Sequence, residues 1–183
     1  MKPMRPGFSI PPLDTYDGPI PNGWVWQYKL NDERAILTPD GTLWNRFGTK
    51  IAGHKARAFA RAVERFRFMF PSMTGDVALL GYRGNFPVGE IVVLDLPELP
   101  GVFQLRHAML SVGINPLVWD SEGRCDPING PLHFLEWSAH PVALFKRSRG
   151  IPGVEGIIGR NPNAPYIQGD SRDMCKSKHE NHP

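Results

Sequence analysis

Two groups of residues, far apart in the chain, could carry chemistry, and the first centres on Lys29. A lysine amine becomes a nucleophile once it has lost its proton, which desolvation and neighbouring cations promote. Arg34 lies five residues further on, and an odd offset along a regular strand points to the opposite face. For both side chains to reach one ligand, the chain must bend at Asn31-Asp32, a pair typical of turns. The alternative for Lys29 is an ordinary surface side chain.

The second group lies near the C-terminus. Lys176 and Lys178 stand two residues apart, so a strand would point both to one face, where two ammonium groups can meet phosphates. The alternative is a basic tail in solvent. Glu155 precedes them in Val-Glu-Gly-Ile-Ile-Gly-Arg and by itself carries no special signal.

Strands are the main elements that must position these residues. Strand-like runs lie at 24–30, 34–37, 42–46, 76–82 and 90–96. Asp40-Gly41 between two of these runs predicts a hairpin. A loop-like stretch follows over 114–131, and shorter pieces lie at 133–137, 143–147, 154–160 and 174–179.

Helical spacing of apolar residues predicts one clear helix over 54–70, ended by Pro71, and a second helix over 102–112. The apolar face of the first consists of Ala56, Phe59, Ala60, Val63 and Phe66. Another face carries Arg57, Arg61 and Arg65, which either contact phosphates or form a solvated surface.

Strands outnumber helices and no regular βαβ alternation occurs, which favours an α+β fold with antiparallel sheets. Residues 1–22 contain six prolines and predict an extended arm that lies on the surface or is partly disordered. We therefore expect an arm over 1–22, one folded domain over 23–178 and a tail over 179–183.

These segments, in their order along the chain, resemble the motifs of the covalent nucleotidyltransferase superfamily of DNA ligases, RNA ligases and mRNA capping enzymes. The family's first motif, KxDGxR, is similar to the segment from Lys29 to Arg34, where Asn31 and Asp32 replace the Asp-Gly pair. Its last two motifs, EGxxxR/K and KxK, match residues 155–160 and 176–178.

Three intermediate motifs of the family also have counterparts. Asn45-Arg46-Phe47-Gly48 resembles the Arg-x-Gly turn whose arginine touches the nick phosphate in ligases. Asp76 stands where the family has the glutamate that holds the ribose, and Leu94 stands where it has the aromatic residue that stacks on adenine. The resemblance covers roughly residues 24–178, nearly the whole chain.

The resemblance implies an adenylation domain of two antiparallel β-sheets flanked by helices, an ATP-grasp-like core without an OB-fold. Lys29 would attack the α-phosphorus of ATP, displace pyrophosphate and carry AMP covalently. Lys176 and Lys178 would act on the phosphates as catalytic cations, and Glu155 would bind Mg²⁺. Further expected nucleotide contacts are Gln27, Arg34, Asp76, Leu94 and Glu155. Expected nucleic-acid contacts are Arg46, Arg57, Arg61 and Arg160.

The implied activity is an ATP-dependent DNA ligase that seals nicked duplex DNA. Alternatives are an RNA ligase, a capping-type guanylyltransferase that uses GTP, or a degenerate nucleotide- or nucleic-acid-binding module without catalysis. Family members normally continue beyond the KxK motif into an OB-fold, whereas here five residues follow Lys178. A partner protein that replaces the OB-fold, or a sequence that is one piece of a longer chain, would each explain this difference.

Length and composition restrict the number of domains, the kinds of partner and the cellular location that this chain can have. The 183 residues suit one domain, and the net charge of +3 with a pI near 9.0 permits a nucleic-acid partner. No apolar run reaches the roughly 18 residues of a membrane helix, and the start lacks the apolar region of a secretory signal, so we expect a cytosolic protein without a membrane partner. Cys125 and Cys175 are far apart and are expected to be plain thiols.

Overall fold

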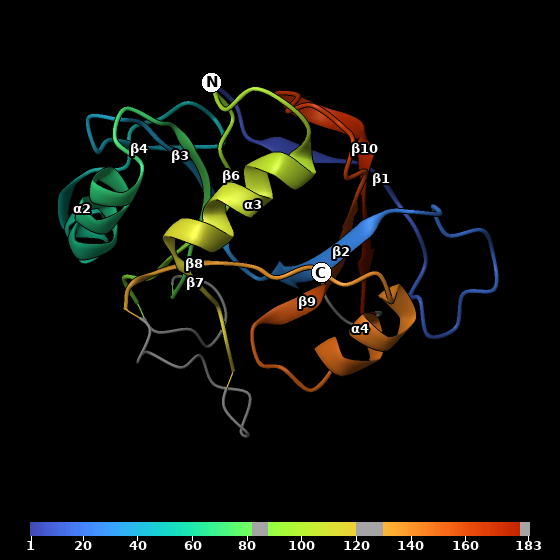
Figure 1. Cartoon of the computed structure of the whole chain (residues 1–183). Coiled ribbons are helices and arrows are strands. Elements are labelled where there is room, and N and C mark those ends of the chain that lie inside the picture. The colour runs from blue at the N-terminus through green and yellow to red at the C-terminus, as the bar shows by residue number, and fades with distance from the viewer. Residues whose placement is uncertain (82–87, 120–129, 180–183) are drawn as a thin grey trace.

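The computed structural model describes residues 1–81, 88–119 and 130–179 (Figure 1). Cys125, part of the expected loop over 114–131 and the last four residues of the expected tail lie outside these ranges. The strands are β1 Met4–Ser9, β2 Val25–Leu30, β3 Glu33–Leu37, β4 Leu43–Asn45, β5 Gly75–Leu79, β6 Ile91–Asp95, β7 Asn115–Pro116, β8 Leu132–Phe134, β9 Val154–Arg160 and β10 Gly169–Lys178. The helices are α1 Gly53–Ala58, α2 Ala60–Met69, α3 Phe103–Gly113 and α4 Pro141–Ser148.

The strands form two sheets, which confirms the expected α+β fold. One sheet has the order β1-β10-β9-β2, and the other has the order β4-β3-β5-β6-β8-β7. Most neighbouring strands are antiparallel, as expected. Three pairs are parallel instead, namely β1 with β10, β6 with β8, and β7 with β8, so both sheets are mixed.

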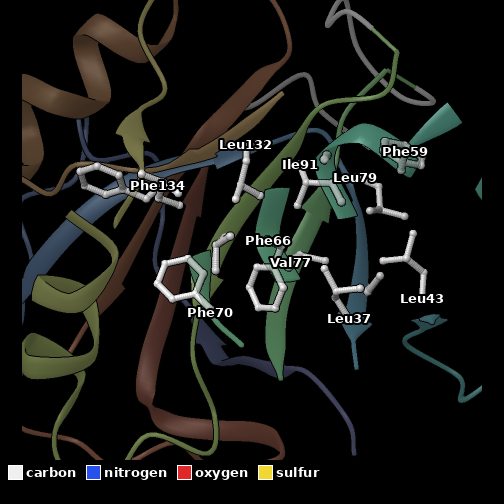
Figure 2. Packing of buried hydrophobic residues seen from close by; sticks show 14 of the residues in the cluster. Leu37, Leu43, Phe59, Phe66, Phe70, Val77, Leu79, Ile91, Leu132 and Phe134 are labelled. Atoms are coloured by element: carbon white, nitrogen blue, oxygen red, sulfur yellow. The ribbon is translucent and has the colours of Figure 1, made fainter. Parts of the chain in front are cut away.

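The two sheets pack face to face between helices. On the outer face of the six-stranded sheet, α2 packs Phe66 and Phe70 against Val77 and Leu79 of β5 (Figure 2). On the outer face of the four-stranded sheet, α4 packs Phe145 against Trp26 and Ile157, and Figure 1 shows this helix beside β2 and β9. All five residues of β6 are buried, so both faces of this strand are covered, which explains its run of apolar residues.

The helix expected over 54–70 is interrupted at Phe59, which has φ −97° and ψ 5° and separates α1 from α2. The buried residues of this region are Phe59, Ala62, Phe66 and Phe70, with Val63 partly buried. Ala60 is exposed, so its assignment to the apolar face was wrong. The break turns the apolar face, and Ala62 rather than Ala60 then meets the sheet.

The start of the chain is folded into the four-stranded sheet. β1 pairs in parallel with β10, with Met4 opposite Gly169 and Ser9 opposite Lys176. Met4 and Leu13 are 3% and 2% exposed. The expectation of partial disorder is therefore wrong for β1, because its backbone is paired in the sheet, although four of its six residues are exposed as a surface segment predicts. In the described residues, no helix has the length and apolar character needed to cross a bilayer.

Candidate active site

A cavity of about 730 Å³ opens between the two sheets. Among the described residues that line it, seven side chains are basic and four are acidic, so an anionic ligand is favoured. The predicted site residues that line it are Lys29, Arg34, Arg46, Leu94, Glu155, Lys176 and Lys178. The predicted site residues outside its lining are Gln27, Asp76, Arg57, Arg61 and Arg160.

The expected bend at Asn31-Asp32 brings Lys29 and Arg34 to the same cavity. β2 ends at Leu30 in the four-stranded sheet, and β3 begins at Glu33 in the six-stranded sheet. The two side chains therefore reach the cavity from opposite walls. Arg34 pairs with Ala78 of β5, and both residues line the cavity.

Lys29 and Lys178 share one carboxylate. The Nζ atoms of Lys29 and Lys178 lie 2.5 Å and 3.1 Å from Oε2 of Glu155. Burial opposes ionisation of Glu155, but hydrogen bonds and charges from the two lysines outweigh it and hold the pKa of this carboxyl below its ordinary value. The Lys29 nitrogen is thus fixed at the cavity wall beside a second ammonium group. Lys176 also lines the cavity, as its two-residue spacing from Lys178 predicts.

Gly156 allows Glu155 to face the cavity. Glu155 and Ile158 both line the cavity although they are three residues apart, which a regular strand does not permit. Gly156, which pairs with both Lys29 and Lys178, has φ +147° and breaks the alternation. A Cβ atom at this position would lie 2.1 Å from the Ser177 carbonyl oxygen. The backbones approach here so closely that only glycine fits.

We expect Gly156→Ala to lower the free energy of unfolding by about 1–3 kcal/mol, because alanine is strained at this φ and collides with β10. Urea denaturation measures the change. Gly150→Ala is the matched control, since its Cβ would meet only the Arg147 carbonyl oxygen at 3.8 Å, and we expect a change below about 1 kcal/mol. Equal effects of the two substitutions would contradict this explanation.

Asp32 is a cavity residue that the sequence motifs did not identify. It lines the cavity at the position where the resembled motif has glycine. Burial raises the pKa of Asp32, the charges of Arg34 and Lys29 lower it, and the charge of Glu155 raises it, with a net rise above the ordinary value. A second carboxyl group therefore stands near the Lys29–Glu155 pair. The only feature of the sequence that pointed to Asp32 was its place in the expected Asn31-Asp32 turn.

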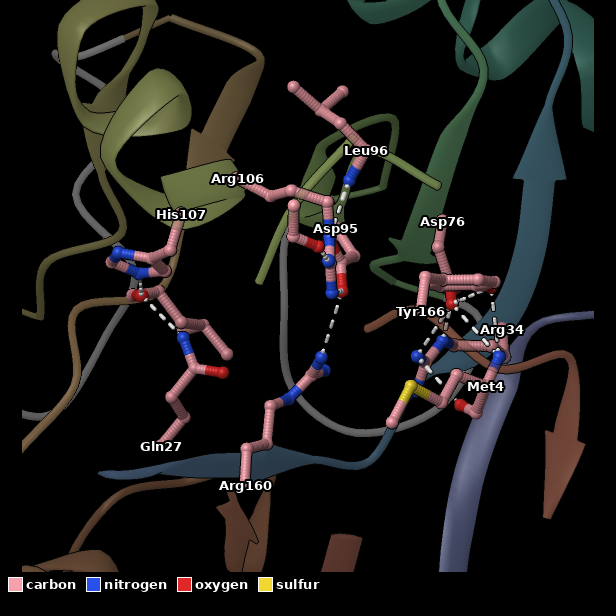
Figure 3. Close-up of polar contacts among 12 residues, drawn as sticks. Met4, Gln27, Arg34, Asp76, Asp95, Leu96, Arg106, His107, Arg160 and Tyr166 are labelled. Carbon is pink, nitrogen blue, oxygen red and sulfur yellow. Dashed lines mark hydrogen bonds and ion pairs between the residues drawn. The ribbon is translucent and has the colours of Figure 1, made fainter. Parts of the chain in front are cut away.

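Part of the cavity lining is apolar. The apolar lining comprises Ala78 and Leu94 of the six-stranded sheet, Leu135 after β8, and Ile158 of the four-stranded sheet, and Leu94 is 7% exposed. Such a surface suits the flat face of a nucleobase through aliphatic contact. Gln27 lies behind it, 3% exposed, where its Nε2 donates to the Leu135 carbonyl oxygen at 2.7 Å (Figure 3). In this position Gln27 supports the wall of the cavity.

Asp76 is buried in an ion pair with Arg34 (Figure 3). Arg34 Nε and Nη2 donate to the two Asp76 carboxylate oxygens at 2.6 Å and 2.9 Å. Burial lowers the pKa of Arg34, but Asp76 overrides this and holds it above the ordinary value. Asp76 is 0% exposed, and a contact with a ribose would require this pair to rearrange.

Arg160 is also buried, at 2% exposure. Its Nη1 lies 3.5 Å from Asp95, which is shared with Arg106, and its guanidinium lies 4.7 Å from the Phe103 ring centre. The expected contact with nucleic acid is therefore incompatible with this position, because the side chain is covered by protein. The physical reason is that Asp95 pairs with it in the interior. Burial lowers the pKa of Arg160 to about 10, against the opposing effect of Asp95.

The other expected nucleic-acid residues are exposed. Arg46 lies at the cavity beside Phe47, with its guanidinium carbon 4.6 Å from the ring centre, and Phe47 is 75% exposed. Arg57 and Arg61 are exposed on α1 and α2, outside the cavity lining. Both alternatives for these residues, a contact with phosphates and a solvated surface, agree with their exposed positions.

No protein-family model and no curated protein matches the sequence. Solved structures do resemble the chain. A Lig E DNA ligase, studied for DNA binding with a minimal scaffold, is 17% identical over 94% of this chain and 68% of its own, with a TM-score of 0.55. The ligase domain of LigD from M. tuberculosis is 17% identical over 97% and 59%, with a TM-score of 0.63. The Chlorella virus DNA ligase-adenylate is 13% identical over 98% and 69%, with a TM-score of 0.55.

Proposed function

We propose that this chain, whose fold is that of the nucleotidyltransferase domain of ATP-dependent DNA ligases, transfers AMP from ATP to the Nζ atom of Lys29. One observation carries the proposal: Lys29 faces a basic cavity, held by a carboxylate that it shares with Lys178. An apolar surface for a base and cations for phosphates adjoin the same nitrogen. The chain spans 59–69% of the length of the three matched structures, so sealing of DNA is part of the proposal.

In the first step, the unprotonated Lys29 amine attacks the α-phosphorus of ATP in line with the leaving group. A nitrogen–phosphorus bond forms, the bond from the α-phosphorus to the bridging oxygen breaks, and pyrophosphate leaves. The ammonium group loses one proton to solvent before the attack, and the nitrogen loses a second proton to solvent as the phosphoramidate forms. Glu155 keeps the nitrogen at the cavity wall, so the reacting atoms need little further ordering.

Cations that face the phosphates stabilise the charge that develops on their oxygens. Lys178 binds the same Glu155 carboxylate as the nucleophile Lys29, and Lys176 faces the same cavity from β10. Arg34 lines the opposite wall. These three side chains are proposed to hold the α-phosphate and the leaving pyrophosphate.

A magnesium ion is proposed to bind near the Glu155 and Asp32 carboxylates. Glu155 and Asp32 supply carboxylate oxygens, the ligand type that Mg²⁺ prefers. In the described residues, no group of three or more histidine, cysteine or acidic side chains is placed to hold a metal alone, so phosphates and water would complete the coordination. Bound Mg²⁺ would neutralise phosphate charge during the transfer.

The second and third steps are proposed from the likeness to DNA ligases. AMP moves from Lys29 to a 5′-phosphate at a nick, and a 3′-hydroxyl then attacks that phosphate, forms the phosphodiester and releases AMP. Arg46 and the exposed Phe47 at the edge of the cavity provide a cation for backbone phosphate and an aromatic surface for a base. Arg57 and Arg61 are proposed to add sequence-independent phosphate contacts.

Incubation with α-labelled ATP and Mg²⁺ tests the proposal. We expect covalent label that is released by pyrophosphate, and transfer of this label to 5′-phosphorylated nicked DNA. Label from GTP in preference to ATP would indicate guanylyltransfer, and sealing of nicked RNA in preference to DNA would indicate an RNA ligase. No covalent label with either nucleotide would contradict the proposal.

One observation favours a second candidate, a nucleotide-binding module without catalysis. Asp76 is committed to Arg34 in the interior and does not line the cavity, although the resembled motif places a ribose-binding glutamate there. This candidate predicts ATP or DNA binding, measured by calorimetry, with no covalent adduct under any nucleotide.

A further inference from the structure

Tyr166 joins the first strand of the chain to the Arg34–Asp76 pair, and no motif of the sequence assigned it a role. Its hydroxyl lies 2.7 Å from Asp76 Oδ2 and 3.3 Å from the Lys2 carbonyl oxygen. A tyrosine hydroxyl has one proton, and the shorter distance assigns its donation to Asp76. The same hydroxyl oxygen accepts from the Met4 backbone N–H at 2.9 Å.

The backbone of Met4 joins this network both as a hydrogen-bond donor and as an acceptor. Its N–H also lies 3.2 Å from Asp76 Oδ2, and its carbonyl oxygen accepts from Arg34 Nη2 at 3.0 Å. Figure 3 shows the four residues gathered at one point, from β1, β3, β5 and the segment between β9 and β10. They are separated by up to 162 positions in the sequence.

The network fixes two of the three guanidinium nitrogens of Arg34. Nε and Nη2 donate hydrogen bonds to Asp76 and Met4, whereas Nη1 has no hydrogen-bond acceptor among the described residues. Arg34 nevertheless lines the cavity, with 15% of its side chain exposed. The orientation set by Asp76 therefore decides where the remaining N–H groups can meet a ligand.

The Tyr166 hydroxyl is suited to stay protonated and to donate a hydrogen bond. Burial raises the pKa of this phenol, and the adjacent Asp76 carboxylate raises it further, so the hydroxyl keeps its proton. A protonated phenol restrains the carboxylate without neutralising it. The hydroxyl contacts Oδ2 of Asp76, the same oxygen that Arg34 Nη2 contacts, and so helps to hold the carboxylate that orients the guanidinium.

We propose that Tyr166 is a positioning residue for nucleotide binding, which acts through Asp76 and the Met4 backbone to hold Arg34 toward the phosphates in the cavity. This inference rests on the proposed function, because it needs a nucleotide in that cavity. It assigns to β1 a part in the site, since the strand supplies both the acceptor and the donor that close the network.

Equilibrium binding of α,β-methylene-ATP, measured by calorimetry on the full chain, tests the inference without any covalent step. Tyr166→Phe keeps the ring and removes only the hydroxyl. We expect its Kd to rise about fivefold to tenfold, less than the full contribution of a hydrogen bond to a charged group, because Tyr166 acts on the nucleotide only through Asp76 and Arg34. The matched control is Tyr16→Phe, because Tyr16 lies outside the cavity lining and packs near Trp26, and its Kd should equal that of the wild type.

A double-mutant cycle separates positioning from a general loss of structure. Calorimetry reports the stoichiometry and the Kd separately, so an irreversibly unfolded fraction lowers only the stoichiometry, whereas reversible unfolding raises the apparent Kd and is detected by circular dichroism of the variant. In an Arg34→Lys background, the fork geometry that Tyr166 maintains is already gone, and Tyr166→Phe should weaken binding less than twofold further.

Unchanged Kd for Tyr166→Phe, or an equal fold-change in both backgrounds, would overturn the role of Tyr166 while leaving the proposed function intact. A wild-type chain that binds no α,β-methylene-ATP would overturn the proposed function and this inference with it.

Discussion

Lys29→Arg is expected to abolish covalent labelling by α-labelled ATP, with a loss on the order of 10³-fold or more. Arginine keeps the positive charge and can keep the ion pair with Glu155, so the cavity should remain charged and folded. A guanidinium stays protonated at any working pH and has no free electron pair for attack on phosphorus. The substitution therefore removes the nucleophile while it leaves the electrostatics of the site almost unchanged.

Denaturing gel electrophoresis after incubation with label and Mg²⁺ measures this loss. Lys146→Arg on α4 is the matched control, since Lys146 is exposed and outside the cavity lining, and it should label like the wild type. Mass spectrometry of the labelled wild-type chain should place the AMP on the peptide that contains Lys29. Label on Lys176 or Lys178, or full labelling of Lys29→Arg, would show that another amine is the nucleophile.

Asp95→Ala is expected to lower the free energy of unfolding by about 3–5 kcal/mol, the cost of leaving buried charges without their partner. Asp95 is 1% exposed and holds two guanidinium groups, with Arg106 Nε at 2.6 Å and Arg160 Nη1 at 3.5 Å. Arg160 is 2% exposed, and this burial lowers its pKa to about 10, because little solvent is left to stabilise its charge. Without Asp95, both arginines would face each other in the interior.

Urea denaturation followed by circular dichroism measures the change. Asp170→Ala is the matched control, because its ion pair with Arg5 lies at the surface, with side chains 67% and 50% exposed, and should contribute less than about 1 kcal/mol. A loss below about 1 kcal/mol for Asp95→Ala would mean that the two arginines find other partners or leave the interior.

The sequence alone determined the local geometry of the candidate site. A residue spacing of two predicts that Lys176 and Lys178 face one side of a strand, and both line the cavity. An odd spacing between Lys29 and Arg34 predicts a bend at Asn31-Asp32, and the two residues lie on strands of different sheets. Such rules succeed where side-chain direction within a regular strand or a turn depends mainly on neighbouring residues.

The tertiary structure alone decided which charged residues reach the cavity and which pair in the interior. Asp76 and Arg160 were expected at ligands, but Arg34 and Asp95 hold them in the interior. Tyr166 and Met4 meet Asp76 although 90 and 72 positions separate them from it. The proline-rich start, which by composition predicts an arm, supplies a strand because β10 offers it an edge. Sequence spacing cannot predict these partners, because the choice between solvent, ligand and buried counter-ion depends on which distant segments the packing of the two sheets brings together.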